Sequence, residues 1–153
     1  MKTLTVQNGD LQLDSSGRPT FQTGANKLIQ DLALWLEEPI GTGYTTPNFG
    51  SLLPGFIGQN FTPYLSARIQ SETLRVLTLY QQNQISALKN AQNLSQLGNW
   101  NKSEIINSID NISVYPNSNI PTIINVTITI TTLANTNLSI NLFVTSNGIQ
   151  VTQ

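Results

Sequence analysis

The most regular pattern of apolar and polar residues lies near the C-terminus. From Ile124 to Ile130 every second residue is apolar, and Asn or Thr fills each position between them. A similar alternation covers residues 138–144, and an Asn-Gly pair at 147–148 marks a further turn. Successive side chains of a strand point to opposite faces of a sheet. We therefore predict a β-hairpin with strands at 122–132 and 138–144, in which one face is apolar and the other carries Thr, Asn and Ser.

Two other segments carry apolar residues at helical spacing. The first starts after Thr23, a candidate N-cap, and ends near Glu37 because Pro39 cannot continue a helix. The second starts at Thr62-Pro63, where threonine caps and proline takes the first helical position, and runs to about residue 94. Their apolar stripes are Leu28, Ile29, Leu32 and Leu36 in the first, and Leu65, Ile69, Val76, Leu77, Tyr80 and Leu88 in the second.

Shorter elements complete the expected order. Residues 3–22 have the pattern of short strands joined by turns, and Asn101-Lys102-Ser103-Glu104 resembles a capping box. We therefore expect a short third helix, which would carry Ile105, Ile106, Ile109 and Ile112. The whole pattern predicts a single α+β domain over residues 1–153, with N-terminal short strands, two to three helices and a C-terminal antiparallel β-hairpin or small sheet.

A Gly- and Pro-rich connection covers residues 39–62. A loop of this length in a compact domain is more often functional than incidental. Its apolar residues include Phe49, Leu52 and Phe56, and we expect these three side chains to be buried against a partner chain.

Composition narrows the chemistry. The chain has no His and no Cys, and 10% of its residues are charged, whereas soluble domains average about 25%. The usual proton shuttle, nucleophile–base pairs and soft metal ligands are therefore missing. The net charge is -1 with no basic stripe, which argues against nucleic-acid binding, and no apolar run is long enough to span a membrane. We expect no catalytic residue, no cofactor, no metal and no small-molecule substrate.

The predicted hairpin lies in a segment without charge, because no charged residue occurs from Thr122 to Gln153. Proteins normally protect exposed strand edges with charge or proline, and an unprotected edge can accept a strand from another chain. The candidate interface positions on the polar face of the hairpin are Thr127, Thr129, Thr131, Ser139 and Asn141. The alternative is an ordinary solvated sheet face.

Two other functions compete with assembly. Glu38, beside the Gly-rich loop, is the best single candidate for a catalytic carboxylate, as in a peptidoglycan-cleaving enzyme, although glycosidases need two carboxylates across a cleft. Trp35 and Trp100 are candidates for a carbohydrate- or peptide-binding module, although core packing is the simpler explanation for Trp35.

Several segments in a fixed order carry a family resemblance. They are the turn and strand at 9–14, the helix containing Leu28-Ile29-Gln30-Asp31-Leu32, the loop Pro47-Asn48-Phe49-Gly50-Ser51-Leu52-Leu53, the long helix with Ile69 and Glu72, and the closing hairpin. Together they resemble the small wedge proteins, or sheath initiators, of contractile phage-tail baseplates and related injection machines. Some members of that family carry an old "lysozyme-like" label.

The resemblance implies a structural subunit and not an enzyme. Such a subunit joins larger wedge proteins, the tail sheath protein and the central hub or tube proteins, and it templates the first sheath ring by β-strand addition. The matching strand-exchange element would be the hairpin at 122–145. The implied location is the tail baseplate of the virion, after assembly in the cytoplasm of a bacterial host. Many members carry a Glu-Pro-Arg triplet before the closing strands, and this chain has Asp110-Asn111-Ile112-Ser113 in that region.

Overall fold

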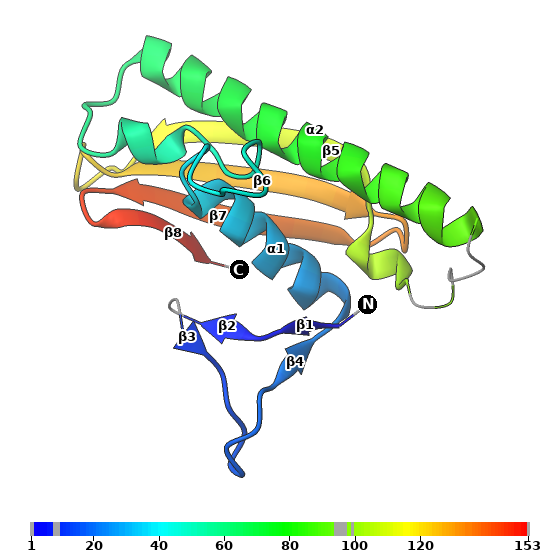
Figure 1. The fold of residues 1–153 in the computed structure, drawn as a ribbon. Coiled ribbons are helices and arrows are strands. Elements are labelled where there is room, and N and C mark those ends of the chain that lie inside the picture. Colours follow the sequence, from blue (N-terminus) through cyan, green and yellow to red (C-terminus); the bar gives the residue numbers. More distant parts are fainter. Residues whose placement is uncertain (1, 8–9, 94–97, 99, 153) are drawn as a thin grey trace.

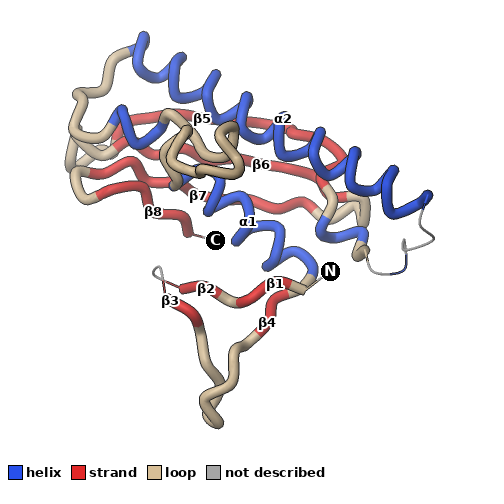
Figure 2. Tube along the Cα trace, in the orientation of Figure 1, coloured by secondary structure: helices blue, strands red, loops and turns tan. Residues whose placement is uncertain are grey.

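The computed structural model describes residues 2–7, 10–93, 98 and 100–152 of the chain (Figure 1). Within these residues, two α-helices lie on one face of an antiparallel sheet of four strands (Figure 2). The sheet runs in the order β5 (Ile106–Pro116), β6 (Ile124–Thr132), β7 (Asn137–Thr145) and β8 (Gly148–Thr152), and the helices are α1 (Gly24–Glu37) and α2 (Pro63–Asn93). The predicted α+β fold with a C-terminal antiparallel sheet is therefore confirmed.

The core forms where the apolar face of the sheet meets the helices. The alternation in β6 places Ile124, Val126, Ile128 and Ile130 on this face, and each is at most 1% exposed. Ile140, Leu142 and Val144 extend the apolar face on β7. The predicted hairpin, its turn and the further turn before residue 148 are all present, because the period of two matches the pleat of the sheet.

The helix starts follow the sequence only in part. Thr62 caps α2, since its side-chain oxygen accepts the N–H of Leu65 at 3.1 Å. Thr23 occupies the N-cap position of α1, but its side chain makes no capping hydrogen bond. The buried carboxylate of Glu104 replaces it and accepts the N–H of Gly24 at 2.8 Å. A negative charge is favourable at this end of a helix, so a distant residue stabilises the start of α1.

The predicted third helix is wrong, because the segment after residue 105 is strand β5. Only a 3-10 turn, η3 (Lys102–Glu104), precedes the strand, with the Asn101 side chain accepting the N–H of Ser103. The register of β5 against β6 shifts twice, between Ile106 and Ser108 and between Ile109 and Asn111. Each shift adds a residue to the strand, so the isoleucines are spaced as on a helix although they lie in a sheet.

An N-terminal arm projects from this body (Figure 1). In the arm, β1 (Thr3–Leu4) pairs with β4 (Phe21–Gln22), and β2 (Val6–Gln7) pairs with β3 (Asp10–Leu11), as the expected short strands. Gln30 of α1 holds the arm through its side-chain amide, which accepts the N–H of Val6 at 2.9 Å and donates to the carbonyl of Leu4 at 2.8 Å. The arm therefore lies along α1.

Candidate functional site

The hairpin predicted to offer an open edge does not have one. In the sheet, β6 lies between β5 and β7, and β7 lies between β6 and β8. The main-chain groups on both sides of the hairpin are therefore already paired within this chain. The expectation that the element at 122–145 accepts a foreign strand is wrong for this reason, and the outer edges of the sheet belong to β5 and β8.

The outer edge of β5 is covered by side chains of α2. Gln70 donates to the carbonyl of Ile112 at 3.0 Å, and Gln81 donates to the carbonyls of Ile106 and Asn107 at 3.3 and 3.0 Å. Near the other end of the strand, the hydroxyl of Ser66 lies 3.4 Å from the carbonyl of Val114. With its two register shifts, β5 makes a poor template for another strand.

The outer edge of β8 pairs with no other segment in the described part of the chain. Thr145 and Gly148 are partners across a two-residue turn, and the register continues to Asn141 and Thr152. In an antiparallel pair, hydrogen-bonded partners alternate with partners whose main-chain groups point away. The N–H and C=O groups of Ile149 and Val151 therefore face outward, and β8 carries no charged side chain.

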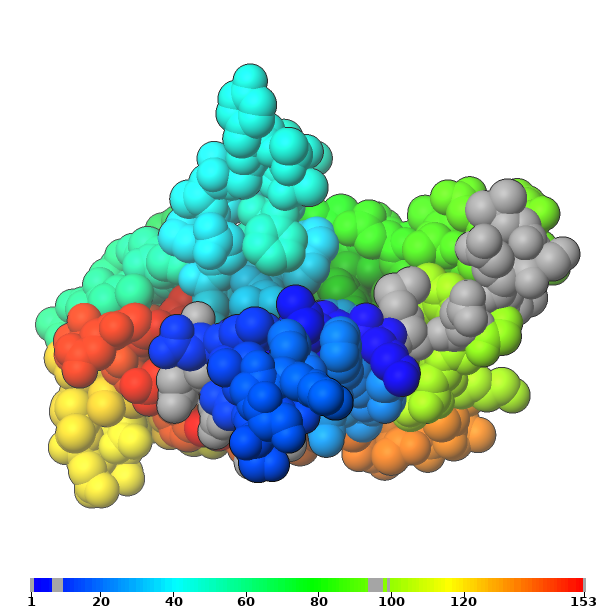
Figure 3. Space-filling view, turned by 60° about the horizontal axis from the view of Figure 1, so that its bottom comes forward, coloured from blue at the N-terminus to red at the C-terminus, as the bar shows by residue number. Residues whose placement is uncertain are grey.

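A groove of about 860 Å³ follows this edge. One wall is α1, with Ile29, Ala33, Leu34 and Glu37, and another is the arm, with Thr5, Val6 and Gln22. Figure 3 looks at the molecule from the side of the arm, which stands in front as the blue segment, while the loop after α1 projects as the cyan segment. The edge of β8 thus forms one side of a groove whose other sides are α1 and the arm.

Glu37 is the one charged residue among the described residues that line the groove. Its side chain keeps contact with solvent, but burial of the carboxylate raises its pKa above the ordinary value, and the backbone N–H of Val151 acts in the opposite direction. An edge donor of β8 is therefore held by a carboxylate of this chain. Gln22, on the arm, adds a buried side-chain oxygen that has no hydrogen-bond partner among the described groups.

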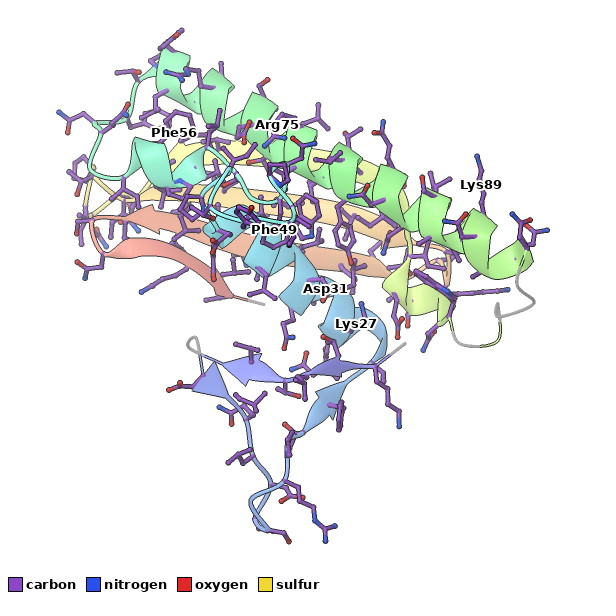
Figure 4. The ribbon with its side chains drawn as sticks, viewed as in Figure 1. Lys27, Asp31, Phe49, Phe56, Arg75 and Lys89 are labelled. Carbon is purple, nitrogen blue, oxygen red and sulfur yellow. The ribbon has the colours of Figure 1, made fainter. Side chains whose placement is uncertain are left out.

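The loop after α1 is held by a second set of polar contacts. Glu72 of α2 accepts the N–H of Leu52 at 2.8 Å and binds Arg75 at 2.7–2.8 Å. Arg75 also donates to the carbonyl of Gly50 at 3.3 Å (Figure 4). Burial acts to raise the pKa of Glu72, but the hydrogen bonds from Arg75 and Leu52 outweigh it and leave the pKa lowered. The carboxylate is therefore charged at neutral pH and fixes the loop against α2.

The three apolar residues expected at a partner interface have different positions. Leu52 is 50% exposed and remains free to contact a partner. Phe49 is partly buried, with its ring centroid 4.7 Å from that of Trp35. Phe56 is 5% exposed and belongs to the core, where the Arg68 guanidinium lies 5.0 Å from its ring centre. The interface role expected for Phe56 is therefore wrong, because its side chain has little surface left to bury.

The five polar candidates lie together on the sheet face away from the helices, and not at an edge. Thr127 donates to Asn141 at 3.1 Å, and the Thr131 hydroxyl lies 2.6 Å from a carboxylate oxygen of Asp110 and 2.8 Å from the amide oxygen of Asn137. Ser139 is the cross-strand partner of Thr129. Thr127 and Thr131 therefore bond to polar side chains of the same sheet, as on a solvated sheet face.

The residues considered for catalysis or sugar binding do not converge. Glu38 accepts a hydrogen bond from Thr42, whereas Glu37 lies at Val151, so the two carboxylates serve different contacts. Trp35 packs against the core, as expected, and Trp100 lines a separate surface depression near residue 102. The described residues contain no cluster of three or more His, Cys, Asp or Glu side chains that could hold a metal ion. No helix within the described ranges is long and apolar enough to cross a membrane.

Sequence reasoning missed both walls of the groove. Glu37 looked like an ordinary charge at a helix end, because nothing local indicates that β8 returns to α1. The alternation Ile149-Gln150-Val151-Thr152 after the Asn-Gly turn was the available signal for a further strand.

The fold and the site together define a small α+β domain with one sheet edge open in a groove. Comparison of the chain with protein-family models, with curated proteins and with solved structures finds no match.

Proposed function

We propose that this chain is a structural subunit of a contractile-tail baseplate wedge, or of a related injection machine, and that it joins its neighbours by β-strand addition at β8. The observation that carries the proposal is the outer edge of β8, which pairs with no further strand in the described part of the chain, carries no charged side chain of its own and lies in a groove. The choice of a tail baseplate as the assembly rests on the resemblance of the sequence to sheath initiators. The proposed partners are larger wedge proteins, the tail sheath protein and hub or tube proteins, in the baseplate of a virion assembled in a bacterial cytoplasm.

Strand addition suits the chemistry of this edge. The outward groups of Ile149 and Val151 would pair with main-chain groups of the added strand, and each such hydrogen bond contributes about 0.5–1.5 kcal/mol. Side chains of the added strand on the helix-covered face would meet Ile29, Ala33 and Leu34. Main-chain pairing gives affinity and these side-chain contacts give specificity, which is the usual division in β-augmentation.

The arm offers additional apolar surface for assembly. Four of its large apolar side chains are 43–60% exposed, namely Leu4, Leu11, Leu13 and Phe21. Buried apolar area contributes roughly 25 cal/mol per Å², so a partner that fills the groove and covers the arm gains more than the strand alone provides. An assembly subunit has a use for such exposed apolar surface, whereas an isolated monomer does not.

The test is co-purification with the sheath and larger wedge proteins of the same tail, using a variant that blocks only the edge. Val151→Pro removes an outward N–H and places a ring in the path of an added strand, while the pairing of β8 with β7 keeps its donors. We expect this variant to lose its partners. Val151→Ala, which keeps the N–H, serves as the control and should retain them.

Two results would contradict the proposal. One is the failure of the unaltered chain to co-purify with either partner class, together with its absence from intact tails. The other is equal co-purification of Val151→Pro and Val151→Ala, which would leave the chain in the assembly but exclude strand addition at β8.

A further inference from the structure

We infer that the strand accepted by β8 carries a Lys or Arg on its helix-covered face, placed next to Glu37. This inference rests on the proposed strand addition and names the chemistry of the partner. It follows from the charge of the groove, from the direction of side chains at the edge and from the unfavourable pairing of two copies of this chain.

Among the described residues of the groove, no cation accompanies the Glu37 carboxylate. Glu37 is the one charged side chain of this described lining, and neither of the ion pairs Lys27–Asp31 and Glu72–Arg75 includes it. The Gln22 oxygen adds a buried acceptor that has no partner within the described part of the chain. The Glu37 carboxylate and the Gln22 oxygen are both acceptors, so an occupant that brings a donor to them is favoured.

Strand addition changes the surroundings of Glu37. A carbonyl of the added strand would take the Val151 N–H with which the carboxylate now interacts. The carboxylate would then be covered by the new strand and lose both this donor and water. A desolvated carboxylate without a partner is costly, whereas a charge-assisted hydrogen bond to Lys or Arg is among the strong ones.

The register specifies the face on which this cation must lie. Val151 pairs with Leu142, which is fully buried on the helix-covered face, so the Val151 side chain points to the same face. Directly opposed residues of neighbouring strands share a face. A residue added opposite Val151 therefore points toward α1, where Glu37 lies. A residue shifted by one position points to the opposite face and away from Glu37.

The same carboxylate disfavours a second copy of this chain as the occupant. Antiparallel pairing of two β8 edges centred on Val151 would bring two Glu37 side chains together without a cation from the described lining of either groove. Like charges brought together in a desolvated site repel each other. Glu37 thus makes strand addition at β8 selective: it disfavours pairing of two copies and addition of neutral strands, and it favours a cationic strand.

The test uses the full chain and two labelled nine-residue peptides of identical composition. Both alternate Val and Thr; one carries Lys at the central Val position, and in the other this Lys exchanges places with an adjacent Thr. The apolar face of each peptide is expected to lie against α1, so the position of Lys decides whether it meets Glu37. Affinity is measured by fluorescence anisotropy at low salt, and the amide signals of Ile149 and Val151 report by NMR whether binding occurs at β8.

We expect the peptide with Lys on the Val face to bind about fivefold tighter than its isomer, the factor expected of a partly exposed ion pair. In Glu37→Gln this ratio should fall to about one, since the isosteric amide keeps the shape and removes the charge. Glu38→Gln is the matched control, because Glu38 is the adjacent carboxylate and contacts Thr42 outside the groove, and here the fivefold ratio should persist.

Each other outcome overturns the inference in a distinguishable way. Equal binding of both peptides, or a ratio that survives Glu37→Gln, would remove the cation requirement and leave strand addition intact. Absence of binding by either peptide would remove both the inference and strand addition. A dimer of the unaltered chain in sedimentation, abolished by Val151→Pro, would identify the occupant as a second copy. If the chain binds the peptides selectively but does not co-purify with tail proteins, the proposed place in a tail baseplate is wrong, and the cation requirement at β8 stands.

Discussion

The two outer edges of the sheet are treated in opposite ways. Along β5, glutamine side chains from α2 hydrogen-bond to main-chain carbonyls, and two register shifts interrupt the regular ladder. Along β8, the ladder is regular, no described segment adds to it, and one carboxylate lies at the edge. A protein that needed only to avoid aggregation would protect both edges. From this difference we infer that β8 is available to a partner strand and that Glu37 would restrict which strand it accepts.

The largest loss of stability is expected for a substitution at Gln84 of α2, which hydrogen-bonds to main-chain groups at the start of β5. Gln84 is buried, donates to the carbonyl of Glu104 at 2.6 Å and accepts the N–H of Ile106 at 3.0 Å. Gln84→Leu leaves both main-chain groups buried without these partners, so we expect a loss of about 2–4 kcal/mol in the free energy of unfolding, measured by urea denaturation. The exposed neighbour Gln82→Leu should change it by less than about 0.5 kcal/mol. Similar values for the two variants would show that β5 is not closed in this way.

Two adjacent prolines in β8 test the direction of its hydrogen bonds. The N–H of Gln150 points to β7 and that of Val151 points to the groove, according to the register. Gln150→Pro should therefore cost about 1–3 kcal/mol of stability through the lost ladder bond, and Val151→Pro less than about 1 kcal/mol. Thermal and urea unfolding of both variants give the comparison. A larger loss of stability in Val151→Pro than in Gln150→Pro would mean that the N–H of Val151, and not that of Gln150, points to β7.

The outer edge of β5 can also be exposed by removing the glutamine side chains that cover it. The double variant Gln70→Ala/Gln81→Ala removes the side chains that contact the β5 carbonyls, and we expect a loss of about 1 kcal/mol together with more self-association at high concentration. Sedimentation velocity and urea denaturation measure the two effects. Asn83→Ala, at an exposed position of the same helix, is the control. Unchanged sedimentation of the double variant would mean that the bulges alone protect β5.

How much the sequence predicts differs between these edges. The hairpin of β6 and β7 was predictable because its alternation has the period of a strand, and both helices were predictable from their apolar stripes and proline positions. Strand β5 was missed because its register shifts place Ile106, Ile109 and Ile112 at helical spacing. The site was missed because its walls, Gln22, Glu37 and Val151, come together only in the folded chain. Local patterns predicted the elements, whereas edge exposure depends on which elements become neighbours.

The smallest expected effect concerns the pH dependence of Glu37 when no strand is bound. Burial raises the pKa of Glu37 above its ordinary value of 4.5, so in the folded state the group holds its proton to higher pH than in the unfolded state. Stability must then decrease as the pH rises from 4.5 through the raised pKa, since the native state binds the extra proton in that window. The difference in unfolding free energy between the unaltered chain and Glu37→Gln should show this slope, at no more than a few tenths of a kcal/mol because solvent screens the group. Glu72 shows the opposite sign, because its lowered pKa gives stability that is lost as the pH falls below 4.5. A difference that grows in favour of the unaltered chain as the pH rises toward 4.5 and then stays constant would mean that the carboxylate is already well paired at the edge, and a groove with a paired carboxylate would have no need of a cationic strand.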